Sequence, residues 1–129
     1  ALEEVGFRHP LAEAAWGKAE VRAFARTAGL PNAEEPSNAC LASRVRRGQP
    51  ITRELLERVG RAEEFLLARG FRRVRVRTDG SGARVEVDPS EVPRLLAEPF
   101  ANEVQRELTG LGFDPVALDP RGYGGRPSA

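Results

Sequence analysis

Residues 73–88 read Arg-Val-Arg-Val-Arg-Thr-Asp-Gly-Ser-Gly-Ala-Arg-Val-Glu-Val-Asp, with valines and charged residues alternating on both sides of a glycine-rich centre. Alternation with a period of two is typical of a half-buried strand, because successive side chains point to opposite faces of a sheet. Asp, Gly and Ser at the centre favour a tight turn. The sequence therefore predicts a β-hairpin with one valine face and one arginine-rich face.

The length of the turn sets which side chains of the hairpin face each other. A four-residue loop, 79–82, places Arg75 opposite Glu86, whereas a two-residue turn would place Arg75 opposite Arg84. Like charges directly opposite each other destabilise strand pairing, so we predict the four-residue loop. In this register Arg77 and Arg84 share the loop end of the polar face, where we expect a site for an anion.

Helical periodicity is found on both sides of the hairpin. Thr52 is a good N-cap, and the apolar residues of the helix after it recur every three or four positions. They are Leu55, Val59, Ala62 and Leu66. After the hairpin, a short helix over 90–96, a second helix over 100–108 and a final strand over 116–118 are predicted. The expected class is α/β (α+β), with helices packed on one face of a small antiparallel sheet.

Composition narrows the class of protein. The 129 residues are 40% hydrophobic and 30% charged, with a net charge of +1, which is typical of a globular domain. No apolar run approaches the roughly 18 residues that a membrane span needs, so no membrane partner is expected. A single cysteine excludes an internal disulfide framework and favours a reducing compartment, here the cytoplasm. Ala1 stands first and the chain has no methionine, so we expect a longer parent protein.

After a predicted helix over 18–28, the chain enters an irregular segment that contains what we call the cysteine loop, residues 36–44. The loop reads Pro36-Ser37-Asn38-Ala39-Cys40-Leu41-Ala42-Ser43-Arg44, and its Pro, Ser and Asn residues disfavour regular structure. A thiol beside guanidinium groups has a lowered pKa and is present more often as the reactive thiolate. One interpretation is therefore a nucleophilic Cys40. The other is a buried cysteine that packs as a small hydrophobe, as most free cysteines do.

The cysteine loop resembles the corresponding segment of the LarE family, and the resemblance extends over nearly the whole chain. The matching residues include Gly48-Gln49-Pro50, Gly70-Phe71-Arg72, Arg75-Val76-Arg77 and Gly122-Tyr123. LarE proteins are ATP-dependent sacrificial sulfur transferases of the PP-loop ATP-pyrophosphatase superfamily. They thiolate a pyridinium mononucleotide during synthesis of the nickel-pincer cofactor. The resemblance implies the C-terminal part of such an enzyme, with the edge of the PP-loop domain in residues 1–50 and a small α+β domain in residues 51–129.

The resemblance also implies roles for individual residues. Cys40 would donate its own sulfur and be consumed once per protein. Substrate binding would involve four residues: Ser43, Arg44, Arg75 and Arg77. Glu63 and Glu86 match best as ligands of a divalent cation that accompanies ATP or the substrate, and ATP with Mg²⁺ is the expected cofactor. An iron–sulfur cluster, which some LarE-like enzymes hold, is not expected with one cysteine.

The chain departs from the family pattern at several points. The PP-loop fingerprint Ser-Gly-Gly-x-Asp-Ser is absent, so we expect the ATP site in a missing N-terminal half. Arg46-Arg47 stands where a Pro-Tyr pair is common, and Gly124-Gly125-Arg126-Pro127 departs from the usual Ser/Asn-rich end. These departures are compatible with a diverged substrate.

Two further functions remain open at this point. One is PP-loop thiolation of another nucleotide or of tRNA, and the other is a non-catalytic anion-binding or oligomerisation module. The expected partner is a small-molecule mononucleotide rather than a nucleic acid. The family also forms symmetric oligomers, so the resemblance implies a homo-oligomer, a trimer or a hexamer.

Overall fold

The structure is a computed structural model that describes residue 6, residues 8–34 and residues 39–124. The chain divides into two compact units, residues 1–38 and residues 39–129, and each is described by itself. Pro36, Ser37 and Asn38 of the cysteine loop lie outside the described residues, as does the departure at 125–127. Among the helices of the described part, none combines the length and the apolar character needed to cross a membrane.

The first unit contains two helices, α1 (Pro10–Glu13) and α2 (Lys18–Thr27). α2 begins after Gly17, whose N–H donates to the Glu20 carboxylate at 2.6 Å. The predicted helix over 18–28 is confirmed to within one residue. Its apolar face is not covered within this unit, because Phe24 is 57% exposed and none of residues 8–34 is buried.

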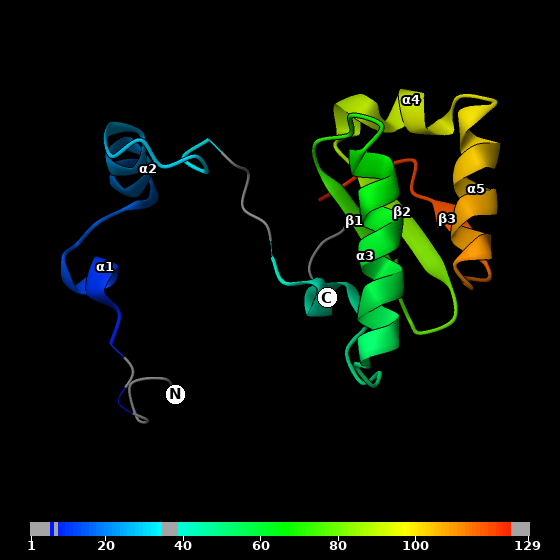
Figure 1. Ribbon diagram of the computed structural model, residues 1–129, viewed down its shortest axis with the longest axis horizontal. Coiled ribbons are helices and arrows are strands. Elements are labelled where there is room, and N and C mark those ends of the chain that lie inside the picture. Colours follow the sequence, from blue (N-terminus) through cyan, green and yellow to red (C-terminus); the bar gives the residue numbers. More distant parts are fainter. Residues whose placement is uncertain (1–5, 7, 35–38, 125–129) are drawn as a thin grey trace. The chain divides into compact units, whose positions relative to one another are not determined.

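The second unit holds the sheet and the remaining helices. Figure 1 shows α3 (Arg53–Leu67) in front of the strands β1 (Val74–Thr78) and β2 (Ala83–Val87). The chain continues through α4 (Val92–Leu96) and α5 (Phe100–Gly110) to β3 (Val116–Leu118). The described part of the cysteine loop belongs to this unit, as a 3-10 turn over Leu41–Arg44. The boundary after residue 50 between a PP-loop domain and a small domain stays a prediction.

The hairpin has the predicted register. β1 and β2 are antiparallel, with Arg75 opposite Glu86 and Arg77 opposite Arg84. The four-residue loop closes through Asp79, whose Oδ1 accepts the N–H groups of Ser81 at 3.2 Å and Gly82 at 2.9 Å. Hydrogen bonds from these two N–H groups, Gly82 first, hold the pKa of Asp79 below its ordinary value.

The direction of β3 differs from the prediction of a wholly antiparallel sheet. β3 pairs with β2 in parallel, in the order β1-β2-β3, so the sheet is mixed. α4 and α5 lie between β2 and β3 in the chain, and a crossover of this length brings the chain back to run in the same direction. The predicted α/β class is confirmed, with this correction to the sheet.

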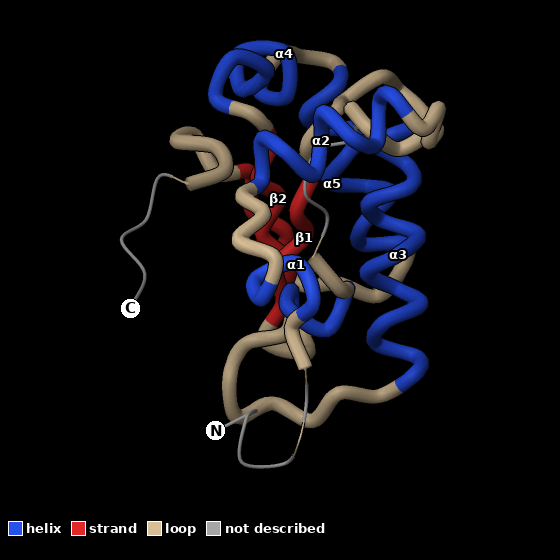
Figure 2. Tube along the Cα trace, turned by 90° about the vertical axis from the view of Figure 1, so that its left-hand side faces the viewer, coloured by secondary structure: helices blue, strands red, loops and turns tan. Residues whose placement is uncertain are grey.

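One face of the sheet forms the hydrophobic core with the helices. In Figure 2, α3 and α5 lie on the same side of the strands. The core residues are Leu55, Val59, Ala62, Leu66, Phe71, Val74, Val76, Ala83, Val85, Val87, Val92, Leu95, Val104, Leu108 and Phe113. The predicted apolar stripe of α3 is therefore confirmed. The other face of the hairpin carries Arg75, Arg77, Arg84 and Glu86, and it borders the candidate site.

Candidate functional site around Cys40

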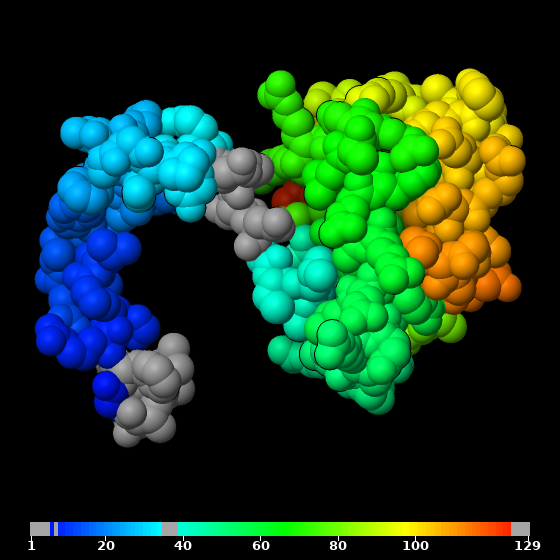
Figure 3. Space-filling view, viewed as in Figure 1, coloured from blue at the N-terminus to red at the C-terminus, as the bar shows by residue number. Residues whose placement is uncertain are grey.

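Cys40 precedes the 3-10 turn and is exposed. In the space-filling view, the turn (cyan) lies against α3 (green) (Figure 3). Leu41 makes this contact, and Gly60 of α3 leaves room for it: a Cβ at Gly60 would lie 3.4 Å from Leu41 Cδ1. Leu41 thus takes the apolar contact while Cys40 beside it stays accessible. The interpretation of Cys40 as a buried hydrophobe does not describe this structure.

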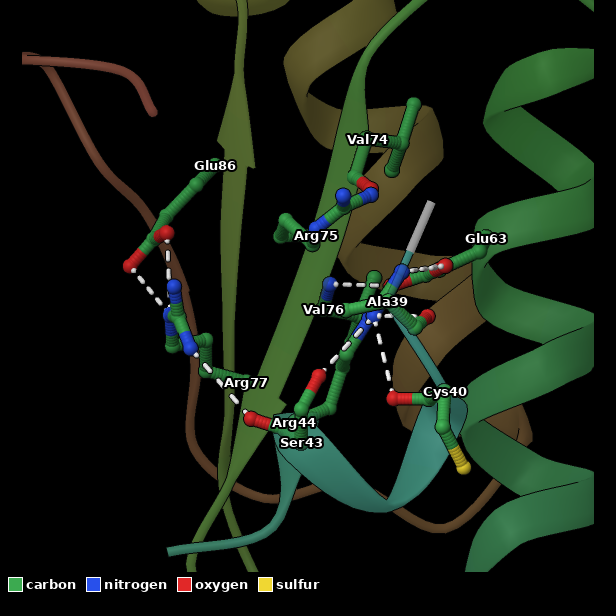
Figure 4. A network of polar contacts seen from close by, with 10 residues as sticks. All are labelled: Ala39, Cys40, Ser43, Arg44, Glu63, Val74, Arg75, Val76, Arg77 and Glu86. Atoms are coloured by element: carbon green, nitrogen blue, oxygen red, sulfur yellow. Dashed lines mark hydrogen bonds and ion pairs between the residues drawn. The ribbon is translucent and has the colours of Figure 1, made fainter. Parts of the chain in front are cut away.

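Arg44 is the residue that organises the loop around Cys40. Its side chain is buried, with the residue only 1% exposed. Nη1 donates to the carbonyl oxygens of Ala39 at 2.7 Å and Cys40 at 3.2 Å, and to Ser43 Oγ at 3.1 Å. Figure 4 shows the Cys40 sulfur pointing away from this guanidinium. The positive charge of Arg44 therefore acts on the backbone of residue 40 rather than pointing at the thiol.

Glu63 of α3 receives the rest of the Arg44 guanidinium. Nε donates to Oε1 at 2.7 Å and Nη2 donates to Oε2 at 3.0 Å, which is a two-point ion pair with almost no solvent exposure. Oε1 also accepts the N–H of Val76 on β1 at 3.0 Å. One carboxylate thus joins the cysteine loop, α3 and β1.

The strand arginines contact the fold as well. Arg77 Nε donates to both oxygens of Glu86, at 3.1 and 3.0 Å, and Arg77 Nη1 donates to the carbonyl oxygen of Ser43 at 3.4 Å. Arg75 Nη1 donates to the Val74 carbonyl oxygen at 2.8 Å, and its guanidinium lies 5.2 Å from the centre of the Tyr123 ring. Of the predicted substrate-binding residues, Ser43, Arg44 and Arg77 are brought together. Arg75 lies on the same strand, two residues before Arg77.

The two acids expected to bind a cation do not form a cation site here. Glu63 is engaged by Arg44 and Val76, and Glu86 is engaged by Arg77. Among the described residues, no group of three or more His, Cys, Asp or Glu side chains is placed to hold a metal ion. This donor set does not fit Mg²⁺, which needs oxygen ligands that are not already paired with arginine. The ATP and Mg²⁺ expectation rests on the resemblance alone.

A basic cleft of about 1130 Å³ opens beside Ser43 and Arg44. Its charged lining residues are Arg44, Arg46, Arg47, Asp79, Arg77, Arg84, Asp119 and Arg121. The sequence predicts an anion site at Arg77 and Arg84, and both residues line this cleft. Sequence reasoning missed the contribution of Arg121, which comes from beyond β3 and has no local pattern to identify it.

Comparisons with known proteins give two strong relatives. An uncharacterized protein of Synechocystis sp. is 40% identical over 123 residues, which cover 95% of this chain and 46% of that protein. The pyridinium-3,5-bisthiocarboxylic acid mononucleotide synthase of Lactiplantibacillus plantarum is 36% identical over 123 residues, which cover 95% of this chain and 44% of that enzyme.

The chain thus spans somewhat less than half the length of the relatives that it matches. No protein-family model matches it. The synthase is a LarE enzyme, and its match covers the cysteine loop, the arginine hairpin and nearly all the rest of this chain. The chain therefore belongs to the LarE family.

Proposed function

We propose that this chain is the sulfur-donating part of an ATP-dependent sulfur transferase. Cys40 gives its sulfur to the activated carboxylate of a pyridinium mononucleotide, in the synthesis of the nickel-pincer cofactor in the cytoplasm. The name of the L. plantarum relative, a synthase of a bisthiocarboxylic acid mononucleotide, supports this substrate class. The observation that carries the proposal is the exposed Cys40 thiol on a backbone held by Arg44.

The first step is attack by the thiolate. Adenylation by ATP supplies a carboxyl carbon with a good leaving group. The Cys40 thiolate forms a bond to this carbon as the bond to AMP breaks, which leaves a thioester between substrate and protein. The attacking sulfur must approach within a few ångströms. An exposed thiol on a turn, pointing away from its own polar network, meets this requirement (Figure 4).

The second step releases the sulfur. A base removes the Cα proton of residue 40, its electron pair forms the Cα–Cβ double bond, and the Cβ–S bond breaks. The substrate leaves as a thiocarboxylate and residue 40 becomes dehydroalanine. Negative charge develops on the carbonyl oxygen of residue 40 as the proton leaves. Arg44 Nη1 donates to this oxygen at 3.2 Å, so the guanidinium stabilises the charge where it forms.

The test uses the full-length protein with ATP and the pyridinium mononucleotide. Intact-mass measurement should show one loss of hydrogen sulfide per thiolated product, with the change located at residue 40 by peptide mapping. Cys40→Ala should give neither product nor mass change. Thiolated product formed by protein of unchanged mass would contradict the proposal.

A second variant examines Arg44. Arg44→Lys keeps the charge but loses the planar group that reaches several oxygens at once. We expect the thioester to accumulate in this variant, because elimination slows more than attack. Equal slowing of both steps would mean that Arg44 acts through the fold alone.

A non-catalytic anion-binding module, the alternative function, would keep its function in Cys40→Ala.

A further inference from the structure

The basic cleft lies at the loop end of the hairpin. Residues 43–47 form one side of it, the hairpin end at 77–84 lies next to them, and residues 115–121 form the remainder. All of these residues belong to the second unit. Cys40 is not among the lining residues, so the cleft is adjacent to the sulfur-donating position and not identical with it.

Half of the arginines that line the cleft are already neutralised. Arg44 pairs with Glu63 and Arg77 pairs with Glu86. Arg121 pairs with Asp119, its Nε donating to Oδ1 at 3.3 Å. Burial raises the pKa of Asp119, but hydrogen bonds from Arg121 and the charges of Arg121 and Arg84 outweigh burial and lower it. Asp119 is therefore held ionised against these arginines.

Among the described residues, the other three arginines of the cleft have no carboxylate within ion-pair distance, although Arg84 is near enough to Asp119 to lower the pKa of that carboxyl. The side chains of Arg46, Arg47 and Arg84 form no hydrogen bond or ion pair with any residue in the described ranges 8–34 and 39–124. Arg84 stands directly opposite Arg77 in the β1–β2 register, so two guanidinium-bearing side chains share one end of the polar face. Like charges placed opposite each other destabilise strand pairing. Glu86 offsets the charge of Arg77, whereas Arg84 has no carboxylate within ion-pair distance among the described residues.

The remaining charge matches a particular class of anion. Asp79 is the lining acid not paired with arginine, and its Oδ1 is engaged by its own turn. Three unpaired arginines beside one aspartate leave about two positive charges in excess. A phosphate monoester carries about −1.5 to −2 charges at pH 7 and offers three acceptor oxygens. Guanidinium groups bind such oxygens in pairs, which a lysine cannot do.

We propose that this cleft binds a phosphate monoester dianion through Arg46, Arg47 and Arg84. The site extends the function of the chain beyond sulfur donation, because binding there requires no chemistry at Cys40. Arg46 and Arg47 also stand where the LarE pattern commonly has Pro and Tyr, so this site is a feature of this chain's own residues.

Isothermal titration of the chain tests the proposal. Nicotinate mononucleotide, nicotinate riboside and inorganic phosphate are the three probes. We expect the mononucleotide to bind and the riboside, which lacks the phosphate, not to bind. Mononucleotide binding tighter than phosphate binding identifies a nucleotide as the ligand. Equal affinity identifies free phosphate, and both results support a dianion site.

Matched variants locate the binding. Arg46→Gln combined with Arg47→Gln should weaken binding by about tenfold or more, and Arg84→Gln should do the same. The control combines Arg61→Gln and Arg106→Gln, which remove the same charge from exposed positions on α3 and α5. Arg84→Lys should retain part of the affinity. Unchanged binding in the cleft variants, or equal weakening in the control, would overturn the proposal, and so would the absence of binding by any phosphate probe.

Discussion

Arg44 combines two properties that rarely occur together, a permanent positive charge and nearly complete burial, since the residue is only 1% exposed. The charge is tolerated because Glu63 neutralises it and three further oxygens accept its N–H groups. A buried charge that loses its partner has no water to replace it. The stability of the cysteine loop therefore depends on a carboxylate of α3 that never touches the thiol.

Replacing Glu63 by Gln should lower the free energy of unfolding by about 3–5 kcal/mol, because the Arg44 charge stays buried without a counter-charge. Urea denaturation of the chain measures this loss. Glu57→Gln on the same helix is the matched control, since its partner Arg53 is exposed, and it should cost less than about 0.5 kcal/mol. Similar losses of unfolding free energy in the two variants would mean that the buried Arg44–Glu63 pair contributes no more to stability than an exposed ion pair.

Sequence reasoning expects Cys40 to donate sulfur and Arg44 to bind substrate, and both roles stay predictions. It did not predict that Arg44 is buried. An arginine in a polar loop, followed by two more arginines, gives no local sign that it is buried. Its partner Glu63 is 19 positions away on a helix face that periodicity alone predicts only as partly buried. Long-range pairing of this kind depends on tertiary packing, which a local pattern does not encode.

The elements themselves were more predictable. The register of the hairpin follows from a four-residue turn and from avoiding Arg75 opposite Arg84, and both are local. The stripe of α3 follows from its period. The predicted direction of β3 was wrong because a run of three apolar residues, Val116–Leu118, looks the same in a parallel and an antiparallel pair.

The loop of the hairpin should make stability depend on pH. The pKa of Asp79 lies below its ordinary value of 3.8, so ionised Asp79 stabilises the fold above that value. This contribution is lost as the pH falls through the lowered, folded-state pKa. Asp79→Asn keeps an acceptor but removes the charge. We expect its urea midpoint to change less between pH 6 and pH 3 than that of the wild type.

Glu64→Gln, on an exposed position of α3, is the control for this comparison and should keep the wild-type pH dependence. An Asp79→Asn profile that follows the wild type throughout would contradict the role given to the turn.

The segment after β3 is held against the sheet at Gly122. Its φ is +69°, and a Cβ there would lie 2.6 Å from the Val87 carbonyl oxygen. Gly122→Ala should therefore be destabilised twice, by about 1 kcal/mol for the positive φ and by about 1–3 kcal/mol for the clash. Gly124→Ala is the control, because its φ is +88° with open space around it. Equal melting temperatures of the two variants would contradict the close packing at Gly122.

At the scale of the whole molecule, the buried hydrophobic residues of the described ranges lie between positions 55 and 113, all in the second unit. We therefore expect residues 39–129, produced alone, to unfold at nearly the same temperature as the full chain. Calorimetry of the two proteins makes the comparison. A large fall in the melting temperature on removing residues 1–38 would show that the first unit stabilises the second.

The family could be recognised from sequence because its matching residues are spread over nearly the whole chain. The relatives confirm this family over 95% of the chain. The trimer or hexamer, the ATP site and the domain boundary stay predictions, because each depends on long-range contacts. Local patterns in 129 residues carry no record of them.

The contacts of Arg44 have one more consequence. Its partners near the thiol are the carbonyl oxygens of Ala39 and Cys40, and these atoms remain when a sulfur is given up. A molecule that had reacted once would therefore keep its shape and its thermal stability while carrying an electrophilic alkene at position 40. If Cys40 donates its sulfur as proposed, a spent copy would differ from a fresh one in the reactivity of that alkene toward small thiols rather than in its folding.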